Sequence, residues 1–164
     1  MRGTGRAEFY PCIVAHASSL EFPFPEPPAP GGATEVAPGV YWLRMALPFQ
    51  LNHINLWLLR DDANGEPGWT IVDTGIGNAA TRALWQQLIE QRIAAQPVRR
   101  VIVTHYHPDH AGNAAWLCDR FGAELWMTQG EYLTAHAVRE RGAGYTPEAV
   151  LRVFCRNGLD AGLA

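Results

Sequence analysis

The order of β-rich and helical patterns constrains the fold of this chain more than any other feature. Three short apolar segments with strand composition come first: VYWLRMAL (40–47), HINLWLLR (53–60) and WTIVDTG (69–75). Asn64-Gly65, between the second and the third, is a typical hairpin turn. The sheet is therefore expected to begin as an antiparallel meander.

Helical spacing follows the third segment. Leu84 and Leu88 lie one turn apart, and Asn78 is suited to cap the start of this helix, which is expected to end near Pro97. A strand pattern returns at 98–104, then a helix starting near His110 and closed by a glycine, a strand at 123–128, and two helices at 129–141 and 147–157. This alternation predicts an α/β fold with a mixed β-sheet flanked by helices.

The N-terminal part has a different composition. The segment EFPFPEPPAPGG (21–32) holds five prolines and two glycines, which favour extended, poorly packed chain. We expect residues 1–35 to form a tail and residues 36–164 to belong to one domain.

Composition and charge exclude several classes of partner. The formal net charge is -3 and there is no long basic run, so neither nucleic acid nor a membrane is expected, and a small-molecule substrate remains. No apolar stretch is long enough to cross a bilayer. The three cysteines, Cys12, Cys118 and Cys155, are odd in number and far apart, which predicts no disulfide framework and a cytoplasmic protein.

The stretch THYHPDH carries most of the chemistry. It places three of the six histidines, with Asp109, between His105 and His110, directly after a predicted strand. Ligands of α/β proteins lie at that end of a strand, and an extended H-x-H directs both imidazoles to the same side. Imidazole and carboxylate suit zinc, and also iron or manganese. Two such ions could support hydrolysis.

HYHPDH, with Thr104 before it and Ala111-Gly112-Asn113 after it, closely resembles the HxHxDH signature of the metallo-β-lactamase superfamily. LNHINLWLL and VDTG resemble the first strands and the aspartate motif of the same family, so the resemblance covers about residues 36–140. It implies an αββα sandwich, of which this chain would form the N-terminal half.

The resemblance also implies roles for the clustered residues. His105 and His107 would bind a first zinc ion, and Asp109 and His110 a second. Asp109 would also be catalytic, orienting the attacking water. The implied reaction is attack by metal-bound hydroxide on an ester, thioester, lactam or phosphodiester bond of a small molecule.

Three further residues are expected to support these ligands. By the resemblance, Asp73 would be a buried carboxylate next to the site; on its own, Asp-Thr-Gly would indicate only a turn. Thr104 and Asn113 are weaker candidates that could cap or brace the loop. The same VDTG also resembles the motif of aspartic peptidases, but that alternative leaves the histidines unexplained.

The family's later ligands are a histidine in a Gly-His loop, a bridging aspartate and a last histidine, and no residue here matches them. His136 falls in a helical pattern and Asp160 follows no strand. Whether the chain is an enzyme therefore stays open. The alternative is an incomplete metal-binding remnant, or a half-domain that pairs with another chain. A half-sandwich would also leave one sheet face uncovered, through which self-association is expected.

Overall fold

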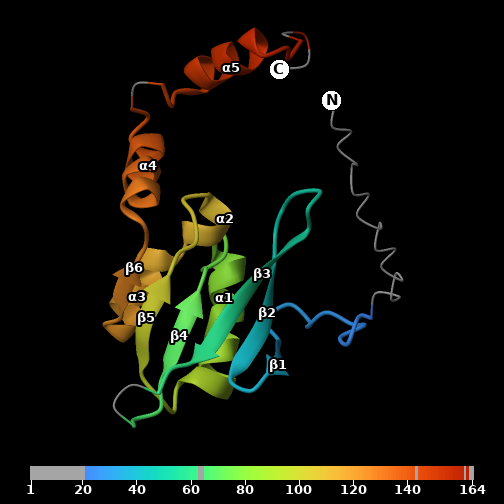
Figure 1. Ribbon diagram of the computed structural model, residues 1–164, viewed down its shortest axis with the longest axis vertical. Helices are drawn as coiled ribbons and strands as arrows, with labels where there is room; N and C mark the ends of the chain where they lie inside the picture. The colour runs from blue at the N-terminus through green and yellow to red at the C-terminus, as the bar shows by residue number, and fades with distance from the viewer. Residues whose placement is uncertain (1–20, 63–64, 143, 161, 163–164) are drawn as a thin grey trace, which may run out of the picture.

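The computed structural model describes residues 21–62, 65–142, 144–160 and 162. Strands β1 to β6 form a single sheet in chain order (Figure 1). β1 to β4 pair antiparallel, whereas β5 pairs parallel with both β4 and β6. The strands are β1 (Ala33–Ala37), β2 (Val40–Ala46), β3 (His53–Arg60), β4 (Trp69–Val72), β5 (Val98–Ile102) and β6 (Glu124–Trp126). The opening meander and the mixed α/β sheet predicted from the sequence are confirmed.

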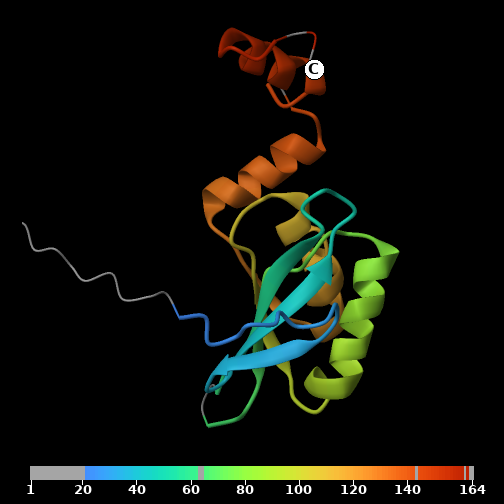
Figure 2. The same ribbon diagram turned by 90° about the vertical axis from the view of Figure 1, so that its right-hand side faces the viewer.

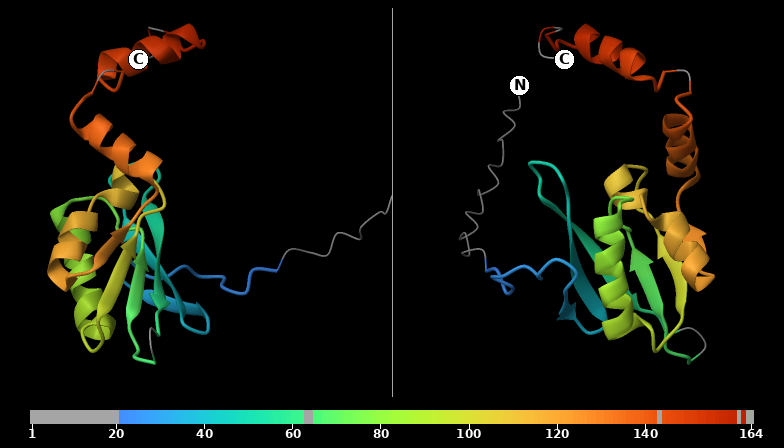
Figure 3. Two further views of the ribbon diagram at one scale, coloured as in Figure 1. Left: turned by 60° about the vertical axis from the view of Figure 1, so that its left-hand side comes forward. Right: turned by 180° about the vertical axis from the view of Figure 1, so that it is seen from behind.

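The helices divide into two groups. α1 (Ala79–Leu88), extended by the π-helical turn η1 (Ile89–Ile93), and α3 (Ala114–Phe121) lie on one face of the sheet (Figure 3). α4 (Gln129–Arg139) and α5 (Pro147–Arg156) extend beyond the end of the sheet, and neither buries a residue (Figure 2). The short α2 (Pro108–Ala111) follows β5. No helix among the described residues is long and apolar enough to cross a membrane.

The core lies between the sheet and its two covering helices. Leu43, Leu56, Ile71 and Val101 are fully buried on the helix-facing side of four consecutive strands. Trp85 is fully buried in α1. This alternation of buried and less buried residues along β2 and β3 is typical of strands that face a core on one side.

The opposite sheet face carries an apolar row, which no described helix covers (Figure 1). Each residue of this row lies opposite the next one in the register of neighbouring strands. Trp57 is 36% exposed and Trp126 is 49% exposed. The full row is Trp42, Trp57, Val72, Ile102 and Trp126. Exposed contiguous apolar surface of this kind is uncommon on a monomer.

Two boundaries differ from the sequence prediction. The predicted tail reached residue 35, but β1 begins at Ala33 and pairs with Leu43 of β2, so the tail ends earlier. Backbone pairing with an existing strand outweighs the proline-rich composition just before it. The first twenty residues of the predicted tail lie outside the described part.

The single helix predicted to start near His110 is in fact divided into α2 and α3. Gly112 lies at the break, where its backbone packs against Gly77 so tightly that a Cβ at either position would clash with the other segment. This close approach interrupts the helix.

Candidate metal centre

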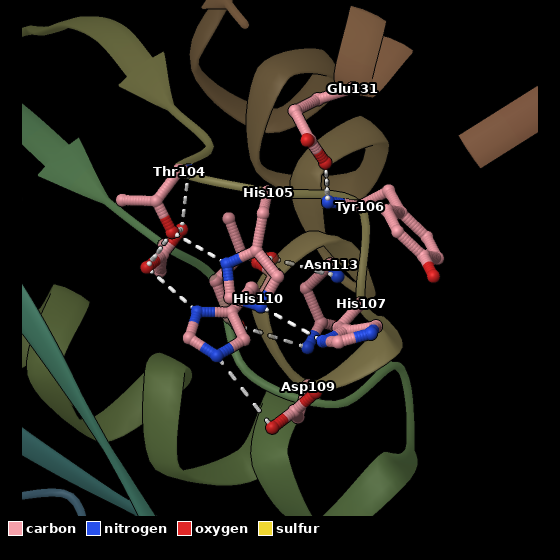
Figure 4. Close-up of polar contacts among 10 residues, drawn as sticks. Thr104, His105, Tyr106, His107, Asp109, His110, Asn113 and Glu131 are labelled. Atoms are coloured by element: carbon pink, nitrogen blue, oxygen red, sulfur yellow. Dashed lines mark hydrogen bonds and ion pairs between the residues drawn. The ribbon is translucent and has the colours of Figure 1, made fainter. Parts of the chain in front are cut away.

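The residues of THYHPDH run from the loop after β5 into α2, which holds Pro108, Asp109 and His110. In Figure 4 the rings of His105, His107 and His110 gather on one side of the loop with the Asp109 carboxylate, while Tyr106 points away. Nε2 of His105 lies 3.0 Å from Nδ1 of His107. Oδ2 of Asp109 lies 3.7 Å from Nε2 of His110. The four predicted ligands therefore form two pairs, each with two donor atoms facing each other.

Asp73 is linked by hydrogen bonds to both pairs, directly to His110 and through Thr104 to His105. It follows β4, is only 5% exposed, and adopts a left-handed backbone conformation with φ 60. Its carboxylate accepts hydrogen bonds from the backbone N–H of Thr104 (2.8 Å), from the Thr104 hydroxyl (2.8 Å to Oδ2) and from Nδ1–H of His110 (2.8 Å). A buried carboxylate is thus satisfied by three donors, as burial of a charge requires.

These contacts assign the protons of two imidazoles. The Thr104 hydroxyl has one hydrogen, which it donates to Asp73, so it accepts from Nδ1–H of His105 at 3.0 Å. His110 uses its Nδ1–H for Asp73. Nε2 of both rings therefore carries a lone pair, which faces Nδ1 of His107 in His105 and Oδ2 of Asp109 in His110. Fixing the far nitrogen in this way is what metal-binding histidines usually require.

The donor set fits zinc. With zinc–nitrogen bonds of about 2.0–2.1 Å, two ligand atoms of a tetrahedral site are about 3.4 Å apart. The facing nitrogens of His105 and His107 are at 3.0 Å, so small movements would admit an ion between them. Among the described residues no three histidine, cysteine, aspartate or glutamate side chains already surround one point. Each pair supplies two ligands, and a zinc site needs three or four.

Asn113 braces the loop that carries Asp73. It is 1% exposed, and its side-chain amide donates to the carbonyls of Thr74 (3.1 Å), Gly75 (3.2 Å) and Ile76 (2.8 Å). Its backbone N–H donates to the Thr74 hydroxyl, which itself donates to the His110 carbonyl at 2.7 Å. Thr104 and Asn113 therefore both contact the segment that carries Asp73, and their role in metal binding stays a prediction.

Two supporting residues were not predicted. Oε2 of Glu131 in α4 accepts the backbone N–H of Tyr106 at 2.8 Å. The indole N–H of Trp85 in α1 donates to the Thr74 carbonyl at 2.8 Å. The Thr128-x-x-Glu131 spacing indicates a helix start, but nothing in it indicates this loop as the partner.

Other candidates lie outside the cluster. His136 is on α4, where its ring packs on Tyr132 with centroids 4.5 Å apart. Asp160 is exposed and accepts only the N–H of Gly162 among the described residues. Burial and the nearby Asp119 carboxylate raise the pKa of the Cys118 thiol, so it stays protonated near neutral pH and is a poor metal ligand. The remaining described cysteine, Cys155, is also free.

Comparison with known proteins identifies the family of this chain. The family model of the metallo-beta-lactamase superfamily matches residues 50–152. A probable metallo-hydrolase of Bacillus subtilis, YqjP, is 32% identical over 84 residues, which cover 51% of this chain and 24% of that protein.

Two solved structures are also similar to this chain. A beta-lactamase domain protein from Burkholderia ambifaria is 49% identical, with a TM-score of 0.71, over 85% of this chain and 41% of its own length. A metallo-beta-lactamase family protein of Thermus thermophilus is 30% identical, with a TM-score of 0.57, over 78% of this chain and 42% of its own. The chain thus spans less than half of each relative. Because the family model matches more than half of the chain, around the HxHxDH loop, this protein belongs to the metallo-β-lactamase superfamily.

Proposed function

We propose that this chain supplies four metal ligands of a zinc-dependent hydrolase. His105 and His107 would hold one ion, and Asp109 with His110 a second; iron or manganese could replace zinc. The observation that carries the proposal is the pair of facing nitrogens, His105 Nε2 and His107 Nδ1 at 3.0 Å. Within the described chain these two atoms have no hydrogen-bond partner besides each other, whereas the far nitrogen of His105 is bonded to Thr104.

The proposed reaction is hydrolysis of an ester, thioester, lactam or phosphodiester bond in a small molecule. When bound, zinc would supply Lewis-acid polarisation of the scissile bond and of water. Asp109 would orient the attacking water, since its carboxylate lies beside Nε2 of His110, the ring nitrogen that does not bond Asp73. Asp73 and Thr104 would keep the imidazoles in the tautomers that ligate.

A second candidate is a metal-binding half-domain without activity of its own. It is favoured by the two-plus-two arrangement of the ligands, because neither pair completes a site of three or four donors. In that case a partner surface must contribute the remaining ligands, and the fold alone does not specify a substrate.

The test measures zinc and turnover in the same samples. We expect the wild-type chain to bind zinc, and His107→Ala to reduce bound zinc and any hydrolysis of ester, thioester, lactam and phosphodiester reporters. His136→Ala removes an imidazole at the surface of α4 and serves as the matched control. Zinc binding without hydrolysis would support the half-domain. Zinc content unaffected by His107→Ala would refute the proposed site.

A further inference from the structure

α4 contacts the ligand loop through one carboxylate. Oε2 of Glu131 accepts the N–H of Tyr106, the residue between the two histidines of the first pair, at 2.8 Å (Figure 4). Within the part of the chain that the structure describes, no other hydrogen bond or ion pair joins α4 to the sheet or to this loop.

No buried side chain of α4 supplements the hydrogen bond from Tyr106 to Glu131. α4 has no buried residue. A cavity of about 490 Å³ borders the helix and the back of the loop, with Tyr106, Pro108, Tyr132 and His136 among its lining residues. Tyr106, which donates to Glu131, thus lies at a cavity rather than in close packing with α4.

Glu131 also departs from its usual local role. It is the third residue of α4, after the N-cap Thr128, whose hydroxyl accepts the N–H of Glu131. In a capping box the glutamate would turn back to the N–H of Thr128. Here it bonds Tyr106 instead, while remaining in the first turn, where the helix dipole favours a negative charge.

The geometry points to Glu131 as a positioning residue for the His105 and His107 pair. Residues 104–106 form bends, and the Tyr106 N–H belongs to the peptide that joins His105 to Tyr106, so the Glu131 hydrogen bond restrains the backbone directly between the two histidines. A hydrogen bond to a carboxylate is roughly twice as strong as one between neutral groups. Tyr106 also packs on His107, with ring centroids 4.7 Å apart, so holding Tyr106 limits the movement of that ring. This inference rests on the proposed metal site.

Three variants of Glu131 separate the effect of side-chain length from the effect of charge. Glu131→Ala removes the acceptor, Glu131→Asp keeps the charge but shortens the side chain, and Glu131→Gln keeps an acceptor of the same length. Zinc affinity, measured by competition with a chromogenic chelator, should fall by about 10-fold or more in the Ala and Asp variants, within the range for groups that support ligands. The Gln variant keeps the acceptor but not the charge and should lose less affinity than the Ala and Asp variants. Glu140→Ala, which removes an exposed carboxylate at the end of α4, should stay near wild type.

A second readout needs no metal. Amide exchange of Tyr106 in the zinc-free chain should be faster in the Ala and Asp variants than in wild type or Gln, with shifted imidazole resonances of His105 and His107. Unchanged zinc affinity and imidazole signals in Glu131→Ala, with only α4 amides exposed, would overturn the inference and leave Glu131 as a helix anchor. If wild type binds no zinc, the proposed function fails, while the exchange data still decide whether Glu131 positions the loop.

Discussion

At the residue scale, the Asp73 carboxylate is the common partner of both ligand pairs. It holds Thr104, which in turn holds His105, and it holds His110 directly. The backbone of Asp73 has φ 60, a conformation that costs free energy for most residues but is tolerated by aspartate and asparagine. The site thus depends on one side chain that would not itself bind the metal.

We expect Asp73→Asn to weaken zinc binding by about 10- to 100-fold, because an amide replaces one acceptor oxygen with a donor that faces Thr104 or His110. Asparagine tolerates the positive φ, so folding should be affected less than in Asp73→Ala, which leaves the part-buried donors of Thr104 and His110 without this acceptor at a cost of about 1 kcal/mol. Chelator competition and urea unfolding measure the two effects. Asp119→Asn, on the exposed side of α3, is the control; an equal loss there would contradict the role of Asp73.

At the element scale, glycines allow the backbone between α2 and α3 to pack closely against the loop after β4. α2 and α3 are separated at Gly112, whose Cα hydrogens face the backbone of Pro108, Gly75 and Gly77. This approach brings the His110 carbonyl to the N–H of Thr74 at 2.8 Å and so joins the ligand helix to the loop that carries Asp73. Helical periodicity predicted one helix here, starting near His110, and it could not detect a break next to a segment 35 residues earlier.

Gly112→Ala and Gly130→Ala form a matched pair. A Cβ at Gly112 would overlap the Pro108 carbonyl and the Gly77 backbone, so we expect a loss of about 1–3 kcal/mol in the free energy of unfolding, together with weaker zinc binding. A Cβ at Gly130 in α4 meets nothing within 4 Å, and alanine there should be neutral or stabilising by up to about 1 kcal/mol. Urea unfolding compares them. Equal stabilities would show that the close approach at Gly112 is not needed.

At the scale of the whole molecule, the described helices cover one face of the sheet and leave the other without a covering helix. α1 and α3 cover one side, while the row from Trp42 to Trp126 faces outward among the described residues. The chain spans 41% of the Burkholderia ambifaria structure that it matches. We propose that this apolar row promotes association of the isolated 164-residue chain with itself.

Trp57→Thr tests this association, because threonine suits a strand and removes the central indole of the row. Sedimentation velocity should show concentration-dependent self-association of the wild-type chain that decreases in the variant. Phe49→Ser removes a 59% exposed aromatic residue outside the row and is the matched control. A monomeric wild type, or equal behaviour of the two variants, would exclude the sheet face as the contact.

The sequence by itself determined the order of strands and helices, the mixed sheet, and the loop in which His105, His107, Asp109 and His110 are gathered. These follow from local periodicity and from side-chain chemistry within a few residues. Only the tertiary structure decided that Asp73 holds His110, that Gly112 divides a helix, and that Glu131 reaches Tyr106. Those contacts join residues 25 to 37 positions apart, and the packing of the sheet, its loops and its helices brings them together.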